Sequence, residues 1–157
     1  MAAETQTAGR PAVDERALVA AAIEAREGAY VPYSHFAVGA ALLDATGKVW
    51  LGCNIENAAY TPSNCAERTA FFKAVSEGAR GFVAIAVVGG PAGKPVDGPC
   101  APCGVCRQVM REFCDPETFQ VVLGSSANEW RTYALKDILP LGFGPEDLGR
   151  EAPRACC

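Results

Sequence analysis

The sequence has no long apolar run, no excess of basic residues and only one histidine. A membrane-spanning helix needs roughly 20 apolar residues in succession. The N-terminus also lacks the basic and then apolar order of a secretory signal, so we expect a cytoplasmic protein with no membrane partner. The formal net charge of −4 leaves no basic stripe for a nucleic-acid backbone. A small, weakly charged substrate is the better match.

Eight cysteines are the most informative feature that the chain does have. Disulfides would explain them in a secreted protein, whereas the reducing cytosol favours metal ligation or free thiols. The 157 residues, half of them apolar, suffice for one domain with a continuous core. We place this domain at residues 11–149, between a disordered arm (1–10) and a tail (150–157) whose cysteines, Cys156 and Cys157, have no assigned role.

The hydrophobic pattern predicts a layered α/β domain. Helices are expected at 14–28, 65–78 and 103–113, strands at 36–43, 48–53, 82–88, 119–123 and 129–135, and a short helical turn or coil at 136–141. Gly39 and Gly52 lie inside strands, where a glycine indicates a close approach to the backbone. Ser63 or Asn64 is the expected cap of the second helix.

Two short motifs carry the candidate chemistry: Cys65-Ala66-Glu67 and Pro102-Cys103-Gly104-Val105-Cys106. Cys65 and Cys103 open their helices, where the positive end of the helix dipole favours ionised thiols. Cys106 follows one turn later on the same face, so that both sulfurs of the second motif can reach one ion. Thiolates suit zinc, and a zinc site with only three protein ligands keeps its fourth position for water, as catalytic sites do.

Glu67 is the candidate catalytic residue. Its side chain can bend toward the open position of the metal, where a carboxylate can accept a proton from activated water and pass it to the substrate. Three thiolates outweigh the charge of a divalent ion, which opposes the ionisation of that water. Arg68 and Arg107 are expected to lie behind the ligands and to offset this charge through hydrogen bonds to the sulfurs.

A fourth thiol leaves an alternative open, because Cys100-Ala101-Pro102-Cys103 is also a C-x-x-C motif. With Cys65 and Cys106, this motif would make a closed, structural site of four thiolates. A C-x-x-C motif is also typical of redox pairs. Pro99 and Pro102 favour an extended approach that holds Cys100 away from the metal, and the sequence assigns Cys100 no other role.

Polar residues near the second predicted strand are the remaining candidates. Asn54 and Glu56 alternate at the strand end, next to Gly52, and they are either exposed surface or a pair that binds the hydroxyl groups of a sugar. The single histidine, His35, has no cysteine or carboxylate at ligand spacing. We expect His35 in a surface loop.

Four sequence blocks, which run from Tyr33 to Leu42, from Gly52 to Tyr60, from Cys65 to Ala70 and from Pro102 to Gln108, resemble the cytidine deaminase family. The resemblance is to its short, homotetrameric type and extends over about Asp14 to Leu148. It implies a three-layer α/β/α sandwich with a five-stranded mixed sheet. Four blocks in a fixed order are far more specific than any one of them.

The resemblance also implies an activity in pyrimidine salvage. Zinc, held by Cys65, Cys103 and Cys106, would support hydrolysis of cytidine and deoxycytidine at C4, which yields uridine or deoxyuridine and ammonia. Glu67 would carry the proton to N3 of the pyrimidine. Cys100 departs from the family pattern, which has no required thiol there.

Substrate contacts follow from the same resemblance. Asn54 and Glu56 match the pair that binds ribose, and Phe36 matches the aromatic residue that stacks on the base. The backbone around Ala66 and Cys103 would contact the base.

The resemblance further implies a homotetramer in which neighbouring subunits complete each pocket. Tyr60 and Phe143 match the positions that reach across between subunits. The preference of the family for free nucleosides agrees with the charge of the chain, which excludes nucleic acid as a partner.

Two other functions remain possible from the sequence. A blasticidin-S-type deaminase shares the zinc and glutamate residues, but the Asn54-x-Glu56 pair and the block from Tyr33 to Phe36 favour a nucleoside. A zinc-stabilised binding or redox module would leave Glu67 as an ordinary surface charge of its helix.

Overall fold

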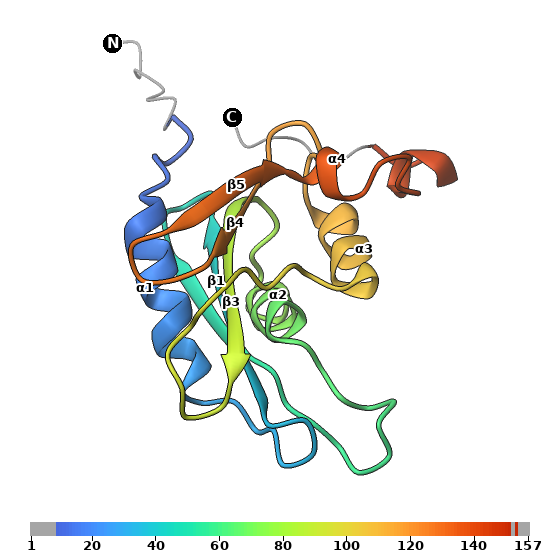
Figure 1. Ribbon diagram of the computed structural model, residues 1–157. Helices are drawn as coiled ribbons and strands as arrows, with labels where there is room; N and C mark the ends of the chain where they lie inside the picture. The colour runs from blue at the N-terminus through green and yellow to red at the C-terminus, as the bar shows by residue number, and fades with distance from the viewer. Residues whose placement is uncertain (1–8, 152, 154–157) are drawn as a thin grey trace.

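A five-stranded sheet separates two helical layers (Figure 1). The computed structural model describes residues 9–151 and 153. The strands lie in the order β2-β1-β3-β4-β5, and their bounds are Phe36–Asp44 for β1, Val49–Cys53 for β2, Phe82–Pro91 for β3, Gln120–Gly124 for β4 and Trp130–Ala134 for β5. Strands β3 and β4 pair in parallel, whereas the other neighbouring strands are antiparallel.

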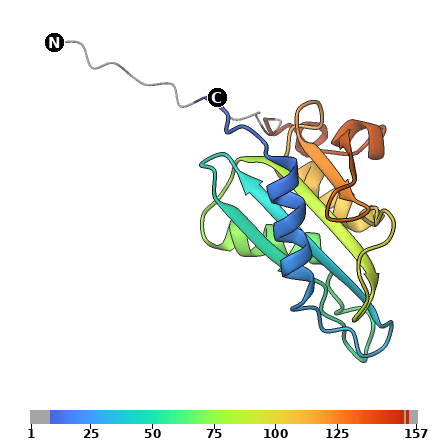
Figure 2. The same ribbon diagram turned by 60° about the vertical axis from the view of Figure 1, so that its left-hand side comes forward.

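The helices cover both faces of this sheet unequally. Helix α1 (Glu15–Arg26) packs on one face, and α2 (Ala66–Ser76) and α3 (Gly104–Phe113) pack on the other (Figure 1, Figure 2). The short α4 (Leu135–Ile138) and a 3₁₀ turn, η1 (Pro145–Leu148), follow the last strand. The predicted three-layer sandwich with a five-stranded mixed sheet is therefore confirmed.

Helix α1 forms where the apolar periodicity predicted it. The carboxylate of Asp14 accepts a hydrogen bond from the N–H of Ala17 at 3.0 Å and so caps the first turn. Leu18, Val19 and Ala22 form a buried stripe that packs against the sheet. Local capping and periodic burial together account for this helix.

Two glycines set how closely the helices approach the sheet. A Cβ added at Gly39 would overlap the backbone of α1 at Ala22, and one added at Gly52 would lie 2.6 Å from the backbone nitrogen of Ala70 in α2. No side chain fits in such a space. The expected close approaches at Gly39 and Gly52 are therefore confirmed, and the second one seats the helix that begins at the first motif.

One predicted detail of the helices, the N-cap of α2, is wrong. The N-cap of α2 is Cys65 itself, and it makes no side-chain capping bond. Asn64 instead donates to the hydroxyl of Thr69 at 3.1 Å, and the Ser63 hydroxyl accepts from the N–H of Asn57 at 3.0 Å. The short helical turn or coil expected at 136–141 corresponds to α4 and the chain after it. The 3₁₀ turn η1 was not predicted, because one turn carries too little apolar periodicity to be recognised.

The predicted arm (1–10) and tail (150–157) lie largely outside the described residues, as do Cys156 and Cys157. Arg10 is described, and its guanidinium donates to the carbonyls of Val83 at 3.1 Å and Thr118 at 2.6 Å, which ties it to the sheet. Within the described part of the chain, no helix combines the length and the apolar character that a membrane crossing needs.

Candidate metal centre and active site

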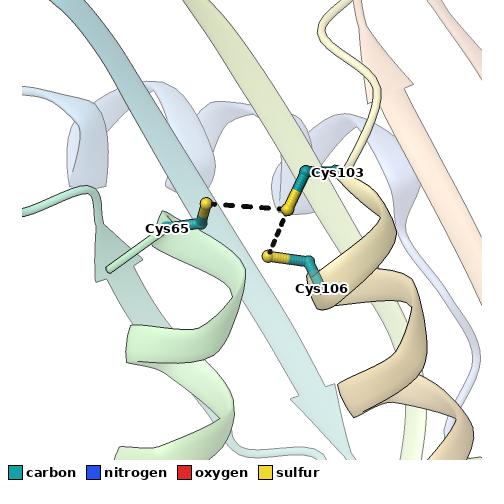
Figure 3. Close-up of side chains that lie close together, drawn as sticks. All are labelled: Cys65, Cys103 and Cys106. Atoms are coloured by element: carbon teal, nitrogen blue, oxygen red, sulfur yellow. Dashed lines mark hydrogen bonds between the residues drawn. The ribbon is translucent and has the colours of Figure 1, made fainter. Parts of the chain in front are cut away.

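The first turns of α2 and α3 bring three cysteines together (Figure 3). Cys65 and Cys103 are the N-cap residues of their helices, both with extended backbone. Cys106 lies in the first turn of α3 and is buried, whereas Cys103 is exposed. The predicted positions of both motifs at helix starts are confirmed, and the two starts face each other.

The spacing of the sulfurs fits a zinc ion. The Cys65 and Cys103 sulfurs are 3.9 Å apart, the Cys103 and Cys106 sulfurs are 3.6 Å apart, and all three lie within 4.8 Å of one another. The edge of a tetrahedron with Zn–S bonds of about 2.3 Å is about 3.8 Å long. No fourth histidine, cysteine or carboxylate among residues 9–151 and 153 belongs to this set.

The thiols share protons unequally. A hydrogen bond from Cys106, with a second one from Arg68, lowers the pKa of Cys65 to about 5 against the opposing effect of burial. The same bond, together with burial, raises the pKa of Cys106 well above its ordinary value. Of these two thiols, Cys65 is the more readily ionised, and metal binding must release the proton that they share.

The two expected arginines have different partners. Arg68 donates to the sulfur of Cys65 at 3.7 Å, as expected, and to the carbonyl of Ser63 at 3.5 Å. Arg107 donates to the carbonyls of Pro102 at 2.7 Å and Ile138 at 2.6 Å, rather than to a sulfur. Arg107 therefore holds the backbone just before Cys103, which differs from the expected offset of charge at the thiolates.

Glu67 stands beside the thiols without belonging to their cluster. Only 3% of the residue is exposed. Burial raises the pKa of its carboxyl to about 7, and the negative charge of Cys65 adds to that rise, while a hydrogen bond with Cys106 opposes it. A carboxyl group with a pKa near neutrality can both accept and return a proton under physiological conditions.

Cys100 lies near the site but outside the thiol cluster. Its sulfur is 2.6 Å from the point that a Cβ of Gly89 would occupy, and the ring of Phe36 reaches within 3.0 Å of the same point. Burial, with the charges of Glu67 and Cys65, raises the pKa of Cys100 to about 11. The alternative of a closed, four-thiolate site is therefore not supported. This packing could not be predicted from the sequence, because it depends on where Gly89 lies near the end of β3.

The predicted sugar-binding pair is engaged with the backbone. Asn54 accepts from the N–H of Val38 at 2.8 Å and donates to the carbonyl of Phe36 at 2.9 Å. One carboxylate oxygen of Glu56 accepts from the N–H groups of Tyr33 at 2.9 Å and Ser34 at 3.2 Å. Hydrogen bonding, led by the Ser34 side chain, lowers the pKa of Glu56. The carboxylate is held ionised and oriented by these bonds.

A shallow cavity adjoins Glu56. It has a volume of about 310 Å³ and is lined by Tyr33, Ser34, Glu56, Tyr60 and Ser63. The rings of Tyr33 and Tyr60 meet edge to face, with centroids 6.2 Å apart. His35 is exposed nearby in a loop, as predicted.

The remaining predicted contacts are spread over the fold. Phe36 begins β1 and is 41% exposed, and Ala66 is fully buried in the first turn of α2. Tyr60 and Phe143 are 75% and 58% exposed. Among the described residues, Tyr60 pairs with the ring of Tyr33, and the carbonyl of Phe143 accepts from Gln108.

The geometry agrees with a known family. Residues 12–122 match the model of the cytidine and deoxycytidylate deaminase zinc-binding region. The chain is 49% identical over 140 residues to a cytidine deaminase from Sporosarcina psychrophila, covering 89% of this chain and 98% of that one. It is 52% identical over 136 residues to one from Halalkalibacterium halodurans, covering 87% and 98%.

Solved structures give the same result. A cytidine deaminase from Burkholderia pseudomallei superposes with a TM-score of 0.75 at 50% identity, over 83% of this chain and 100% of that one. One from Mycobacterium tuberculosis gives a TM-score of 0.71 at 39% identity, over 85% and 99%. The chain belongs to the cytidine and deoxycytidylate deaminase family, and its three-cysteine cluster fits the zinc site that the family description names.

Proposed function

We propose that this protein hydrolyses the C4 amino group of cytidine and deoxycytidine, giving uridine or deoxyuridine and ammonia. The observation that carries the proposal is the buried carboxylate of Glu67 beside a cluster of three thiols. Relatives named cytidine deaminase, which match nearly their whole length, support it.

Cys65, Cys103 and Cys106 are the proposed zinc ligands. When bound there, zinc supplies a water made acidic enough to act as a nucleophile near neutral pH. The hydrogen bond from Arg68 to the Cys65 sulfur lowers the charge density on the thiolates. Arg107, through the carbonyl of Pro102, sets the position of Cys103 instead.

Glu67 is the proposed general base and acid. Its carboxylate accepts the proton of the attacking water and delivers it to N3 of the pyrimidine. The pKa near 7 suits both halves of this transfer. Burial keeps the carboxylate from exchanging that proton with bulk solvent.

The nucleoside is proposed to lie between the thiol cluster and the cavity beside Glu56. The carboxylate of Glu56 and the second N–H of the Asn54 amide would bind the sugar hydroxyls. The exposed ring of Phe36 would stack on the base. The backbone at Ala66 and Cys103 would complete the base contacts.

A homotetramer with shared active sites, working in the cytoplasm in pyrimidine salvage, completes the proposal. Tyr60 and Phe143 are large aromatic residues that the chain leaves exposed, which suits contacts with another subunit. A blasticidin-S-type activity or a purely structural zinc site is not favoured by the named relatives.

Elemental analysis and a substrate panel test the proposal together. The purified protein should carry about one zinc per chain and should remove the ultraviolet band of cytosine from cytidine and deoxycytidine. Blasticidin S should remain largely unchanged. Turnover of the antibiotic without turnover of either nucleoside would reverse the assignment, and stoichiometric zinc with no turnover at all would favour the structural module.

A further inference from the structure

Arg111 is a buried charge that the proposed chemistry does not use. It lies in the last turn of α3 and is 5% exposed. Its guanidinium forms an ion pair with Glu146 in η1, while its Nη1 has no hydrogen-bond partner among the described residues. A buried charge costs free energy, and an ion pair alone is weak evidence of a net gain in stability.

The segment that packs on Arg111 is shaped to fit it. A Cβ at Gly144 would lie 2.6 Å from Nη1 of Arg111, so the backbone of Gly144 lies directly against the guanidinium. The N–H of Gly144 donates to the carboxylate of Asp147 at 2.7 Å, which closes the turn. Arg111, Gly144 and Glu146 therefore form one clamp between α3 and η1.

Phe143 is the residue immediately before this clamp. Its carbonyl accepts a hydrogen bond from the side chain of Gln108, also on α3, at 2.8 Å. The backbone of Phe143 is thus held at its carbonyl and at the next residue by the helix that carries two of the three thiols. Its ring is nevertheless 58% exposed. A large aromatic side chain on a restrained backbone is suited to a contact outside its own chain.

We propose that Arg111 is a positioning residue: its clamp with Glu146 and Gly144 presents the ring of Phe143 to the nucleoside pocket of a neighbouring subunit. The inference rests on the proposed deaminase function and its shared active sites. A restrained ring loses little conformational entropy when it packs on a substrate, so the clamp acts on binding rather than on the proton transfer. Loss of the clamp should raise KM and leave kcat nearly unchanged.

Glu146→Gln is the test variant, because the Glu146 side chain is 42% exposed and its loss of charge does not require refolding of the core. We expect KM for cytidine to rise about twofold to tenfold, the range of one aromatic contact. Zinc content should not change. Arg111→Lys, which keeps the charge but not the planar fork, should act in the same direction. Glu112→Gln, on the same helix and with no ion pair recorded among the described residues, is the matched control.

A double-mutant cycle separates positioning from general loss of stability. If the clamp acts through Phe143, adding Glu146→Gln to Phe143→Ala should raise KM no further. An independent, structural role would give additive effects and a lower melting temperature in both backgrounds. Additive effects would therefore overturn the inference.

The outcomes also distinguish this inference from the function on which it rests. If Phe143→Ala raises KM while both clamp variants match Glu112→Gln, the inference fails and the deaminase stands. If the unaltered protein turns over no nucleoside, the proposed function fails first. A fall in kcat with unchanged KM in Glu146→Gln would also overturn the positioning role.

Discussion

The two faces of the sheet differ in whether the buried side-chain nitrogens of their arginines are hydrogen-bonded. On the α1 face, Arg26 donates to the carbonyls of Ala37, Lys94, Gly90 and Pro91 at 2.6–2.9 Å. On the face of α2 and α3, Nε of Arg68 and Nη1 of Arg111 are buried, and neither has a partner in the described part of the chain.

On one face of the sheet the donors of the buried arginine are hydrogen-bonded, whereas on the other face two buried donor atoms are left unpaired among the described residues. Buried polar atoms in proteins are nearly always hydrogen-bonded, so unpaired ones call for an explanation. Every donor of Arg26 named above meets a carbonyl of its own chain, as expected of a purely structural group. The second layer holds the thiols and the buried Glu67, to which the proposed function assigns a metal and a substrate, and the clamp that we propose positions Phe143.

Removal of a thiol should give the largest effect. Cys65→Ala should lose the zinc and essentially all activity, because two remaining thiolates cannot hold the ion and binding of structural zinc is worth about 10–16 kcal/mol in small sites. Metal content by elemental analysis, together with the cytidine assay, measures this. Cys100→Ala is the control: it should keep its zinc. Loss of zinc in that variant would instead favour the alternative in which Cys100 is a fourth ligand.

Glu67→Gln should come next. The substitution keeps the shape of the side chain but cannot accept the proton, so kcat should fall about 10²- to 10⁴-fold. Zinc content and melting temperature should stay near those of the unaltered protein, since Glu67 is not among the clustered ligands. Glu77→Gln, at the exposed end of the same helix, should leave kcat unchanged. Full activity of Glu67→Gln would favour a structural metal site.

Arg26→Met tests the role of the hydrogen-bonded arginine on the α1 face of the sheet. It should lower the free energy of unfolding by about 3 kcal/mol, because several buried carbonyls lose a charged donor, while zinc per folded chain stays constant. Urea denaturation followed by circular dichroism gives the free energy. Arg80→Met is the control, since exposed Arg80 donates only to the nearby carbonyls of Val75 and Ala79. Equal effects of the two variants would contradict the assigned role of Arg26.

Gly39→Ala should have the smallest effect of this series. A methyl group there overlaps the backbone of α1, and overpacking of this kind costs about 1–3 kcal/mol. Gly104→Ala, where nothing lies within 4 Å of the added Cβ, should leave thermal stability unchanged or slightly higher. A melting temperature of Gly39→Ala equal to that of the unaltered protein would mean that α1 moves away from the sheet without cost.

Local pattern was enough to predict much of the fold and the centre of the site. The period of apolar residues located α1, and the spacing of Cys103 and Cys106 placed two sulfurs on one turn. The position of Cys65 at a helix start could be predicted because the apolar pattern of that helix begins directly after it. These features depend on residues only a few positions apart.

The parts that the sequence did not reveal depend on long-range packing. Cys100 meets Gly89 across a loop, and Arg111 meets Glu146 between two separate elements. Arg107 was expected at the thiolates, but nearby carbonyls were available to its guanidinium. A single sequence shows which side chains can pair and not which of several partners is nearest, so these assignments required coordinates.

The close approaches at Gly39 and Gly52 have a consequence for how this domain tolerates change. In the register of β1 and β2, Ala40 lies opposite Gly52, so the two glycines are diagonal neighbours, with α1 over one and α2 over the other. Both helices approach the sheet closely at this spot, and hydrogen is the largest substituent that either position accepts. We expect any chain whose cysteine-bearing helix packs this close to the sheet to have glycine at both positions. The two glycines, together with the cysteines, then identify this arrangement.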